Sequence, residues 1–440
     1  MKESFVLTLV SGLRLVLGAL TQAYVLATLG IGMQTDAWLA GLIVPALAGV
    51  LITAPLNQVL APLFAEQSPA ARQSDAWACF AVLSGVCVSI VIMLIALAGV
   101  WVPLLVPGFA LAGKTLAIAL TQIQLLSLIF QVPFCVLWSL QCAKGRLVVA
   151  EATQVISSFV SLVAAAFLLP RFGVRAAAFA VVLKTALDVL LLIRILGPMR
   201  HMTLRSSLMT KVWRRARYLL AGAVYFSSES FVNTWLTSFV GAGGLSAFSL
   251  GQQLYNVLGQ VVHKAIAAPM MPRLASAASE GRWGDVRRIY QQRTGWAAGM
   301  AVVAFAGLVL IGKPLLGLLV GRSGITASNV DLIWLTLVAL GGMCFGALMG
   351  QVTVSALHAL GDTKTPTQFG FLTYTIYIPL KIAAFTVLGL TGLALASSIF
   401  FLVNLAGQYV LLSRAVTKGL RQDMGQAFTA TSKSISIRHG

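Results

Sequence analysis

Long apolar runs separated by short loops constrain the fold of this chain more than any other feature of its sequence. A helix that crosses a membrane needs roughly 20 mainly apolar residues, and the chain contains about twelve such runs and no hydrophilic stretch large enough for a soluble domain. Hydrophobic residues make up 58% of the 440 residues and charged residues only 10%. A water-soluble fold of this size would lack polar surface, so the sequence predicts an all-α integral membrane protein.

The runs and the turn residues between them predict about twelve membrane-spanning helices. The first run, which follows Lys2, is longer than the roughly 7–15 apolar residues of a signal-peptide core, so we expect it to stay in the membrane. The predicted spans cover residues 4–30, 35–64, 75–101, 115–142, 147–170, 174–197, 213–240, 246–272, 290–312, 328–358, 366–388 and 392–413.

Basic residues are distributed unevenly over the loops between these spans. Of the 31 Lys and Arg residues, 22 fall on the side of the N-terminus, five on the opposite side and four inside spans. The positive-inside rule places the richer side, and with it both termini, in the cytoplasm. The formal net charge of +19 then reflects membrane topology and attraction to anionic lipid headgroups, and we expect no nucleic-acid partner.

The two halves of the chain resemble each other at a nearly constant offset. A Pro-Leu-Leu sequence closes the third span at Pro103 and the ninth at Pro314, 211 residues later. A proline also ends the second span, at Pro62, and the eighth, at Pro272, with an offset of 210. These echoes predict two six-helix lobes that enter the membrane from the same side, a parallel repeat. The first lobe would cover residues 1–197 and the second lobe residues 213–416. A basic cytoplasmic linker at residues 198–212 would join them, and a polar cytoplasmic tail would cover residues 417–440.

Polar residues inside the spans are concentrated in the first, second, seventh and eighth, and the tenth adds Gln351 and His358. An ionisable group in a span costs at least roughly 2.5 kcal/mol, so it normally faces protein or a wet cavity. In the first span Arg14 and Gln22 share one helix face, and from Gln253 onward the polar residues of the eighth span do the same. We therefore expect a binding cavity with these candidate residues: Arg14, Gln22, Asn57, Glu229, Asn233, Gln253, Asn256, Gln260, His263 and Lys264.

Structural roles are alternatives for several polar residues. Amides such as Asn57 and Gln260 often join helices through hydrogen bonds. His263 and Lys264 are close enough to the cytoplasmic end of their span to extend toward water. Two further groups could be structural or functional: the i, i+4 pair Lys184 and Asp188, and Lys381.

No motif for catalysis or nucleotide binding accompanies these spans. Five cysteines, an odd number without CxxC spacing, are expected to be buried structural thiols. We therefore expect a transporter rather than an enzyme, with no cofactor and no metal site. Asp36 and Glu229 are candidates for coupling transport to protons or sodium ions.

Four short motifs follow one another along the chain: Gly32–Trp38 between the first two spans, Pro45, Pro272, and Gly361–Pro366. They resemble the MviN/MurJ family of lipid II flippases, within the multidrug/oligosaccharidyl-lipid/polysaccharide (MOP) superfamily that also holds multidrug and toxin extruders (MATE). The resemblance implies two lobes around a central cavity of spans one, two, seven and eight, alternating access, and a bacterial inner-membrane location. Its implied partners are a lipid-linked glycan, membrane lipids and polysaccharide-synthesis enzymes.

The sequence also departs from the pattern that the resemblance implies. Ile43 and Gly49 stand where basic residues are expected in the second span, and Gln252, Gln253 and Asn256 where an acidic-basic cluster is expected in the eighth. Two further C-terminal spans are expected, whereas the printed sequence closes with a polar tail.

The weaker cavity charge favours one cargo over others. A polyprenyl-diphosphate-linked glycan rich in hydroxyls, such as an exopolysaccharide or O-antigen repeat unit, suits an amide-rich cavity, with Arg14 and Lys264 attracting its diphosphate. There are three alternatives. The protein could be a lipid II flippase, a multidrug extruder of the same superfamily, or a membrane scaffold for polysaccharide synthesis that transports nothing.

Residues 279–293, between the eighth and ninth spans, have an amphipathic pattern. Trp283, Val286 and Tyr290 alternate at helical spacing with four arginines. This pattern predicts a separate interfacial helix on the cytoplasmic leaflet.

Overall fold

Helices form nearly all of the structure. The computed structural model describes residues 2–197, 207–320 and 327–438, and these ranges contain no strand. The all-α fold class predicted from the sequence is confirmed. Contacts divide the chain into two compact units, Met1–Ser249 with Leu318–Asn329, and Leu250–Gly317 with Val330–Gly440.

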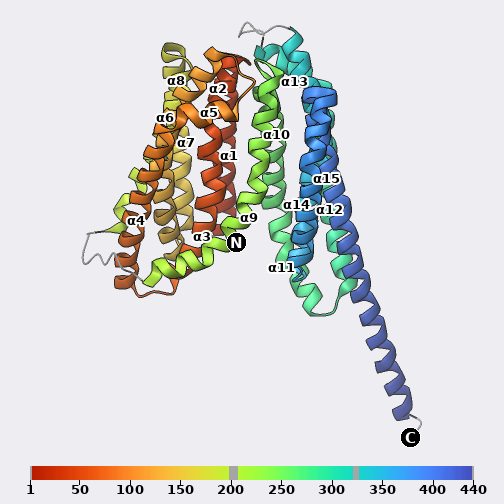
Figure 1. The fold of residues 1–440 in the computed structure, drawn as a ribbon. Coiled ribbons are helices and arrows are strands. Elements are labelled where there is room, and N and C mark those ends of the chain that lie inside the picture. The colour runs from red at the N-terminus through yellow and green to blue at the C-terminus, as the bar shows by residue number, and fades with distance from the viewer. Residues whose placement is uncertain (1, 198–206, 321–326, 439–440) are drawn as a thin grey trace. The chain divides into compact units, whose positions relative to one another are not determined.

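Long helices of the first unit run up and down beside one another (Figure 1). Its elements are α1 (Lys2–Leu29), α2 (Met33–Ala48), the π-helical turn η1 (Gly49–Thr53), α3 (Ala54–Ala65), α4 (Pro69–Ala96), α5 (Ala98–Leu105), α6 (Leu111–Ala143), α7 (Leu147–Phe172), α8 (Val174–Leu192), the 3-10 turn η2 (Ile193–Leu196), α9 (Ser207–Thr237), the 3-10 turn η3 (Ser238–Val240) and the start of α10 (Gly244–Val262).

The core of the first unit forms around α6. This helix contacts α2, α3, α4, α5 and α8, and its Leu120, Leu125 and Leu137 have no exposed surface. Gly41 of α2 lies so close to α6 that a Cβ there would overlap the side chain of Gln124. Small residues at such contacts let helix backbones approach closely, which is how helices associate in lipid.

The second unit contains the rest of α10, the π-helical turn η4 (His263–Ala267), α11 (Ala268–Ser279), most of α12 (Trp283–Val320) and α13 (Ala327–Ala339), α14 (Gly341–Ala359) and α15 (Lys364–Arg438). Glycines of α14 set its distance from α15. A Cβ at Gly346 would lie 2.6 Å from the carbonyl carbon of Phe401, and one at Gly342 would lie 2.7 Å from the Cβ of Ser398. The two helices therefore pack backbone to backbone at these points.

The twelve predicted spans all correspond to helical stretches in the predicted order. Nine stretches of the described residues are long and apolar enough to cross a membrane. The last of these, Lys364–Arg421, contains Gly389, whose φ of 59° and ψ of −138° interrupt the helix and divide it into two spans. The other two predicted spans correspond to α9 and α10–η4–α11, in which the sequence concentrates polar residues and which are not among those nine stretches.

A π-helical turn followed by an Ala-Pro dipeptide occurs in each unit. η1 leads into Ala54-Pro55 and η4 into Ala268-Pro269, 214 positions later. Proline lacks an N–H donor and clashes with the carbonyl four residues earlier, and the wider turn relieves both problems. This match is one more echo between the halves.

The division into lobes at residues 198–212 stays a prediction from the repeat. Residues 198–206 lie outside the described ranges, and residues 207–212 begin α9. α9, which the prediction assigns to the second lobe, contacts α2, α3 and α5 of the first unit. Residues 417–438 of the predicted tail continue α15 as helix.

The prediction of a separate interfacial helix at residues 279–293 is wrong. A turn with φ +74° at Gly281 ends α11, and residues from Trp283 onward form the first turns of α12 without a break before the span. Val286 and Tyr290 are buried, and Trp283 lies against Gly419 of α15. The apolar face is therefore covered by another helix rather than by lipid.

Candidate functional site

A polar cavity of about 370 Å³ lies inside the first unit. It is lined by α1, η1, α3, α6, α7 and α8, and it includes two of the predicted site residues, Arg14 and Asn57. Two cations and two carboxylates face one another around it. Charges at this depth in apolar helices require partners, and each has one.

Arg14 reaches from α1 to two polar residues of α7. Its Nη1 donates to Oε1 of Gln154 at 2.6 Å, and its Nε lies 3.6 Å from Oε2 of Glu151. Ser11 also donates to Oε2 of Glu151 at 3.1 Å. The Glu151 side chain is only 11% exposed, whereas that of Arg14 is 32% exposed, so the guanidinium is more accessible than its partner.

Lys184 and Asp188 of α8 repeat this arrangement. Lys184 Nζ lies 3.2 Å from Oδ2 of Asp188, and Ser157 of α7 donates to the other carboxylate oxygen. The lysine side chain is 33% exposed and the aspartate 6%. The i, i+4 ion pair predicted from the sequence is present, and it also lines the polar cavity.

Asn57 combines a helix-joining contact with a place in the cavity wall. Its Oδ1 accepts hydrogen bonds from Ser139 Oγ at 3.0 Å and from Cys135 Sγ at 2.8 Å, both in α6. Both of these hydrogen bonds use the amide oxygen of Asn57 and neither uses its amide nitrogen. The helix-joining contact offered as one interpretation of Asn57 is therefore present, and its role in binding stays a prediction.

Sequence reasoning missed Glu151 and Gln154. Both lie in the predicted fifth span, three residues apart and on one face of α7. An ionisable residue at the start of an otherwise apolar run was the signal that could have identified Glu151.

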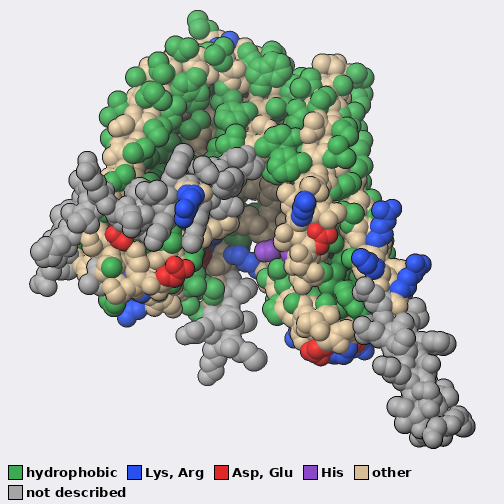
Figure 2. Space-filling view, turned by 60° about the horizontal axis from the view of Figure 1, so that its bottom comes forward, with side chains coloured by type: hydrophobic (Ala, Val, Ile, Leu, Met, Phe, Trp, Pro, Cys, Tyr) green, Lys and Arg blue, Asp and Glu red, His purple; other side chains and the backbone are tan. Residues whose placement is uncertain are grey.

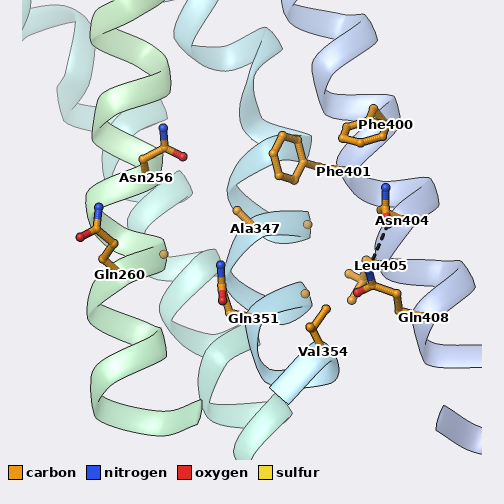
Figure 3. Close-up of a pocket in the computed structure, with 13 residues that line it drawn as sticks. Asn256, Gln260, Ala347, Gln351, Val354, Phe400, Phe401, Asn404, Leu405 and Gln408 are labelled. Atoms are coloured by element: carbon orange, nitrogen blue, oxygen red, sulfur yellow. Dashed lines mark hydrogen bonds between the residues drawn. The ribbon is translucent and has the colours of Figure 1, made fainter. Parts of the chain in front are cut away.

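A second cavity, of about 420 Å³, lies inside the second unit between α10, α14 and α15 (Figure 3). We call it the amide cavity because its described lining contains five carboxamide side chains and no charged residue. The five are Asn256, Gln260, Gln351, Asn404 and Gln408.

Small residues open the amide cavity and amides give it polarity. Ala347 and Gly350 of α14 are small residues in its wall, and a Cβ at Gly350 would meet nothing within 4 Å. Asn404 Nδ2 donates to Oγ1 of Thr373 at 3.0 Å, and Gln408 Nε2 donates to Oδ1 of Asn404 at 3.0 Å (Figure 3). Phe400 and Phe401 complete the wall. Amides and aromatic rings around an uncharged space suit a ligand with many hydroxyls.

The amide cavity brings together predicted and unpredicted residues. Asn256 and Gln260 were site candidates, and Gln351 was noted as polar, whereas Asn404 and Gln408 were missed. Their spacing of four residues in the predicted twelfth span places them on one helix face, which was the available signal.

Asp36 caps a helix. Its carboxylate accepts hydrogen bonds from the backbone N–H of Gly243 at 2.6 Å and of Ser246 at 2.7 Å, and from the Ser246 hydroxyl. Gly243 has φ +97° and precedes the first residue of α10, so the usual capping position carries no side chain. Asp36, on α2, supplies the missing acceptor, and its charge suits a helix N-terminus. Ion coupling through Asp36 stays a prediction.

The other site candidates lie outside the two cavity linings. Gln22 is half-buried on α1, and Gln253 is half-buried on α10. Glu229 and Asn233 lie one turn apart on α9, and His263 and Lys264 form the start of η4. Lys381 is fully buried and donates to Oη of Tyr377, which is 2.9 Å from Ser397 Oγ.

The described ranges also contain the five cysteines and other side chains that can bind metal ions. Four of the five cysteines are buried and Cys142 is partly exposed, and none forms a disulfide. The described residues contain no group of three or more His, Cys, Asp or Glu side chains that could hold a metal ion.

Comparison with known proteins identifies the family. A profile of the family described as lipid II flippase MurJ matches residues 25–437. The chain belongs to the MurJ family. MurJ relatives include a probable lipid II flippase from Vibrio cholerae, 24% identical over 199 residues that cover 44% of this chain and 38% of that protein. Another, from Rhizobium tropici, is 24% identical over 176 residues covering 39% of this chain and 32% of that protein. The matched stretch spans less than two fifths of either relative.

Solved structures share the fold over most of the chain. Lipid II flippase MurJ in an inward closed conformation superposes with a TM-score of 0.81, at 15% identity, over 97% of this chain and 92% of that one. An inward-facing MATE family multidrug transporter gives a TM-score of 0.79 at 17% identity, over 92% and 96%. The resemblance to the MurJ family found in the sequence is confirmed by the family profile, and the solved MATE structure shares the fold.

Proposed function

We propose that this protein moves a polyprenyl-diphosphate-linked glycan from the cytoplasmic to the outer leaflet of a bacterial inner membrane by alternating access. The observation that carries the proposal is the contrast between the two cavities. The polar cavity presents Arg14 and Lys184 in front of more deeply buried carboxylates. The amide cavity offers five carboxamides without a charged neighbour in its described lining.

The two chemistries match the two parts of such a cargo. A guanidinium forms short, paired hydrogen bonds with phosphate oxygens, so Arg14 is the proposed diphosphate contact, with Lys264 as a second cation. Carboxamides both donate to and accept from sugar hydroxyls. The proposed glycan contacts are Asn233, Gln253, Asn256, Gln260, Gln351, Asn404 and Gln408.

An exopolysaccharide or O-antigen repeat unit is the favoured glycan. The absence of charge from the described lining of the amide cavity supports a neutral, hydroxyl-rich ligand there. Enzymes of polysaccharide synthesis would then supply the cargo. Lipid II is the second candidate, because the family description and the curated relatives carry that name.

Coupling and orientation belong to the same proposal. Glu229, an acidic residue within the polar seventh span, is the proposed site for protons or sodium ions. Both chain ends would lie in the cytoplasm, where the positive-inside rule places the richer loops.

Genetic complementation tests the cargo. The protein would be expressed in a strain depleted of its lipid II flippase and in a mutant that lacks its polysaccharide flippase. We expect restored glycan export in the second strain and no rescue of growth in the first. Rescue of the depleted strain would replace the favoured glycan with lipid II. Restored export in neither strain, with the protein present in the membrane, would count against a flippase for either cargo.

A further inference from the structure

The first turns of α12 and the end of the apolar part of α15 enclose a pocket of about 190 Å³ in the second unit. Arg287, Tyr290 and Gln291 line it from α12, and Tyr409, Ser413 and Thr417 line it from α15. None of these residues belongs to the polar cavity or the amide cavity. The pocket therefore needs its own explanation.

Tight packing beside the pocket holds α12 and α15 together. A Cβ at Gly419 would lie 2.1 Å from the ring of Trp283, so the indole rests directly on the α15 backbone. Tyr290 is buried, its ring centre is 6.4 Å from that of Tyr409, and its hydroxyl is 3.0 Å from Oγ1 of Thr353. These contacts fix the spacing between the two helices at the pocket.

Arg287 is the cation that faces the pocket without a carboxylate partner among the described residues. The nearby carboxylates are occupied, since Arg282 pairs with Glu280 at 2.7 Å and with Asp285 at 2.9 Å. Arg288 takes the other oxygen of Asp285 at 3.1 Å.

The charge around the pocket is strongly positive. Hydrogen bonds from Ser276 and Arg282 lower the pKa of Glu280, which keeps that carboxylate ionised and paired. Residues 280–293 carry four arginines against two carboxylates. The α15 wall adds three more basic residues and no acid between positions 414 and 421. The pocket therefore attracts anions.

Both helices change from apolar to basic at the level of the pocket. α12 has no charged side chain from Trp296 to Gly312, and α15 has none from Ile382 to Ser413. Exposed valines lie on both helices there, including Val302, Val303 and Val410. In Figure 2 the basic side chains of the second unit gather toward its lower end, below faces covered by hydrophobic side chains. A change from apolar to basic side chains is typical of the level of lipid phosphates, and the positive-inside rule assigns this side to the cytoplasm.

We propose that this pocket binds the phosphate headgroup of an anionic phospholipid. Arg287 pairs with the phosphate, and the hydroxyl of Thr417 donates to one of its oxygens. Ser413, whose own hydroxyl donates to the carbonyl of Val410 at 2.8 Å, lines the pocket beside them. The acyl chains lie along the exposed apolar surfaces of α12 and α15. The site is separate from the proposed glycan cavities, so it holds whichever cargo the protein carries.

Lipid titration of the full chain in detergent tests the site. Binding of dioleoyl phosphatidylglycerol, dioleoyl phosphatidylcholine and inorganic phosphate would be measured by native mass spectrometry and by the shift in melting temperature. We expect phosphatidylglycerol to bind more tightly than phosphatidylcholine, and Arg287→Gln to weaken that binding about fivefold or more. Arg288→Gln is the control, because it removes the same charge one residue along the chain. The Arg288 side chain is 80% exposed and paired with Asp285, so its loss should change binding less than about twofold.

A second variant separates the pocket from its charge. Ser413→Leu fills the pocket without changing the net charge, and should also weaken phosphatidylglycerol binding while leaving the melting temperature in lipid-free detergent near that of the wild type. Equal weakening by Arg287→Gln and Arg288→Gln would overturn the site in favour of diffuse surface attraction. Inorganic phosphate that stabilises as well as phosphatidylglycerol would overturn the lipid as ligand in favour of a free anion.

Discussion

In each ion pair of the polar cavity, the difference in burial between the two partners determines which charge faces the cavity. In both pairs the carboxylate is the more deeply buried partner, held by a serine hydroxyl, and the cation is the more exposed one. Removing one member of a partly buried pair leaves the other uncompensated. Arg14 and Glu151 are therefore expected to act as a unit.

Arg14→Ala should reduce glycan export by at least about tenfold, because it removes the proposed diphosphate contact and the partner of Glu151. Arg14→Lys keeps the charge without the planar fork and should retain part of the export. Export would be measured in the complemented polysaccharide mutant, with membrane levels determined by immunoblot.

Arg171→Ala is the matched control for Arg14→Ala, because it removes one exposed arginine at the end of α7, away from the cavity lining. It should leave export unchanged. Wild-type export by Arg14→Ala would show that Arg14 does not anchor the cargo.

Asp36 offers a choice between capping and ion coupling. Asp36→Ala removes the acceptor for two backbone N–H groups at the start of α10 and should lower the free energy of unfolding by about 0.5–2 kcal/mol. Asp36→Asn keeps an acceptor oxygen and should destabilise less. Thermal unfolding in detergent measures both. If Asp36→Asn instead leaves the melting temperature unchanged and abolishes export, the result would support ion coupling through Asp36. Helix capping alone would then not explain the role of Asp36.

Among the helices, the contact between α14 and α15 depends on glycines at defined positions. Gly346 lies against the α15 backbone, whereas a Cβ at Gly350, one turn later, would meet nothing within 4 Å. One added methyl group should therefore destabilise the protein at Gly346 and have little effect at Gly350, on the next turn of the same helix.

Gly346→Ala should destabilise the second unit by about 1–3 kcal/mol, the usual cost of overpacking a close contact. Gly350→Ala, the matched control, should change stability by less than about 0.5 kcal/mol. Melting temperatures in the same detergent compare the two. Equal melting temperatures for both variants would show that α14 and α15 separate enough to accept the methyl group.

For the whole molecule, the predicted orientation can be tested at the two ends of α6. Ala112 and Lys144 are both exposed and lie near its start and its end. In a cysteine-free background, Ala112→Cys should react with a membrane-impermeant thiol reagent in intact cells. Lys144→Cys should react only after permeabilisation. The reverse pattern would place both chain ends outside the cytoplasm.

The family motifs show how far sequence reasoning reaches. The motifs Gly32–Trp38 and Gly361–Pro366 supported the family assignment. The contacts that they make in the fold could not be predicted from the spacing of their residues. Asp36 accepts from the start of α10, and Asp362 accepts from the N–H of Thr365 at the start of α15. Both are helix-end contacts, and the first joins residues about 210 positions apart, which no local pattern indicates.

By itself, the sequence determined the multi-pass, all-α character of the protein, the order of its helical stretches and the family. These follow from local composition, because lipid selects for apolar length in each helix separately. Only the tertiary structure decided that Arg14 meets Glu151, that Asp36 caps α10, and that amides of α10, α14 and α15 enclose one cavity. Those pairings depend on which helix faces meet, and the packing of distant residues sets that choice.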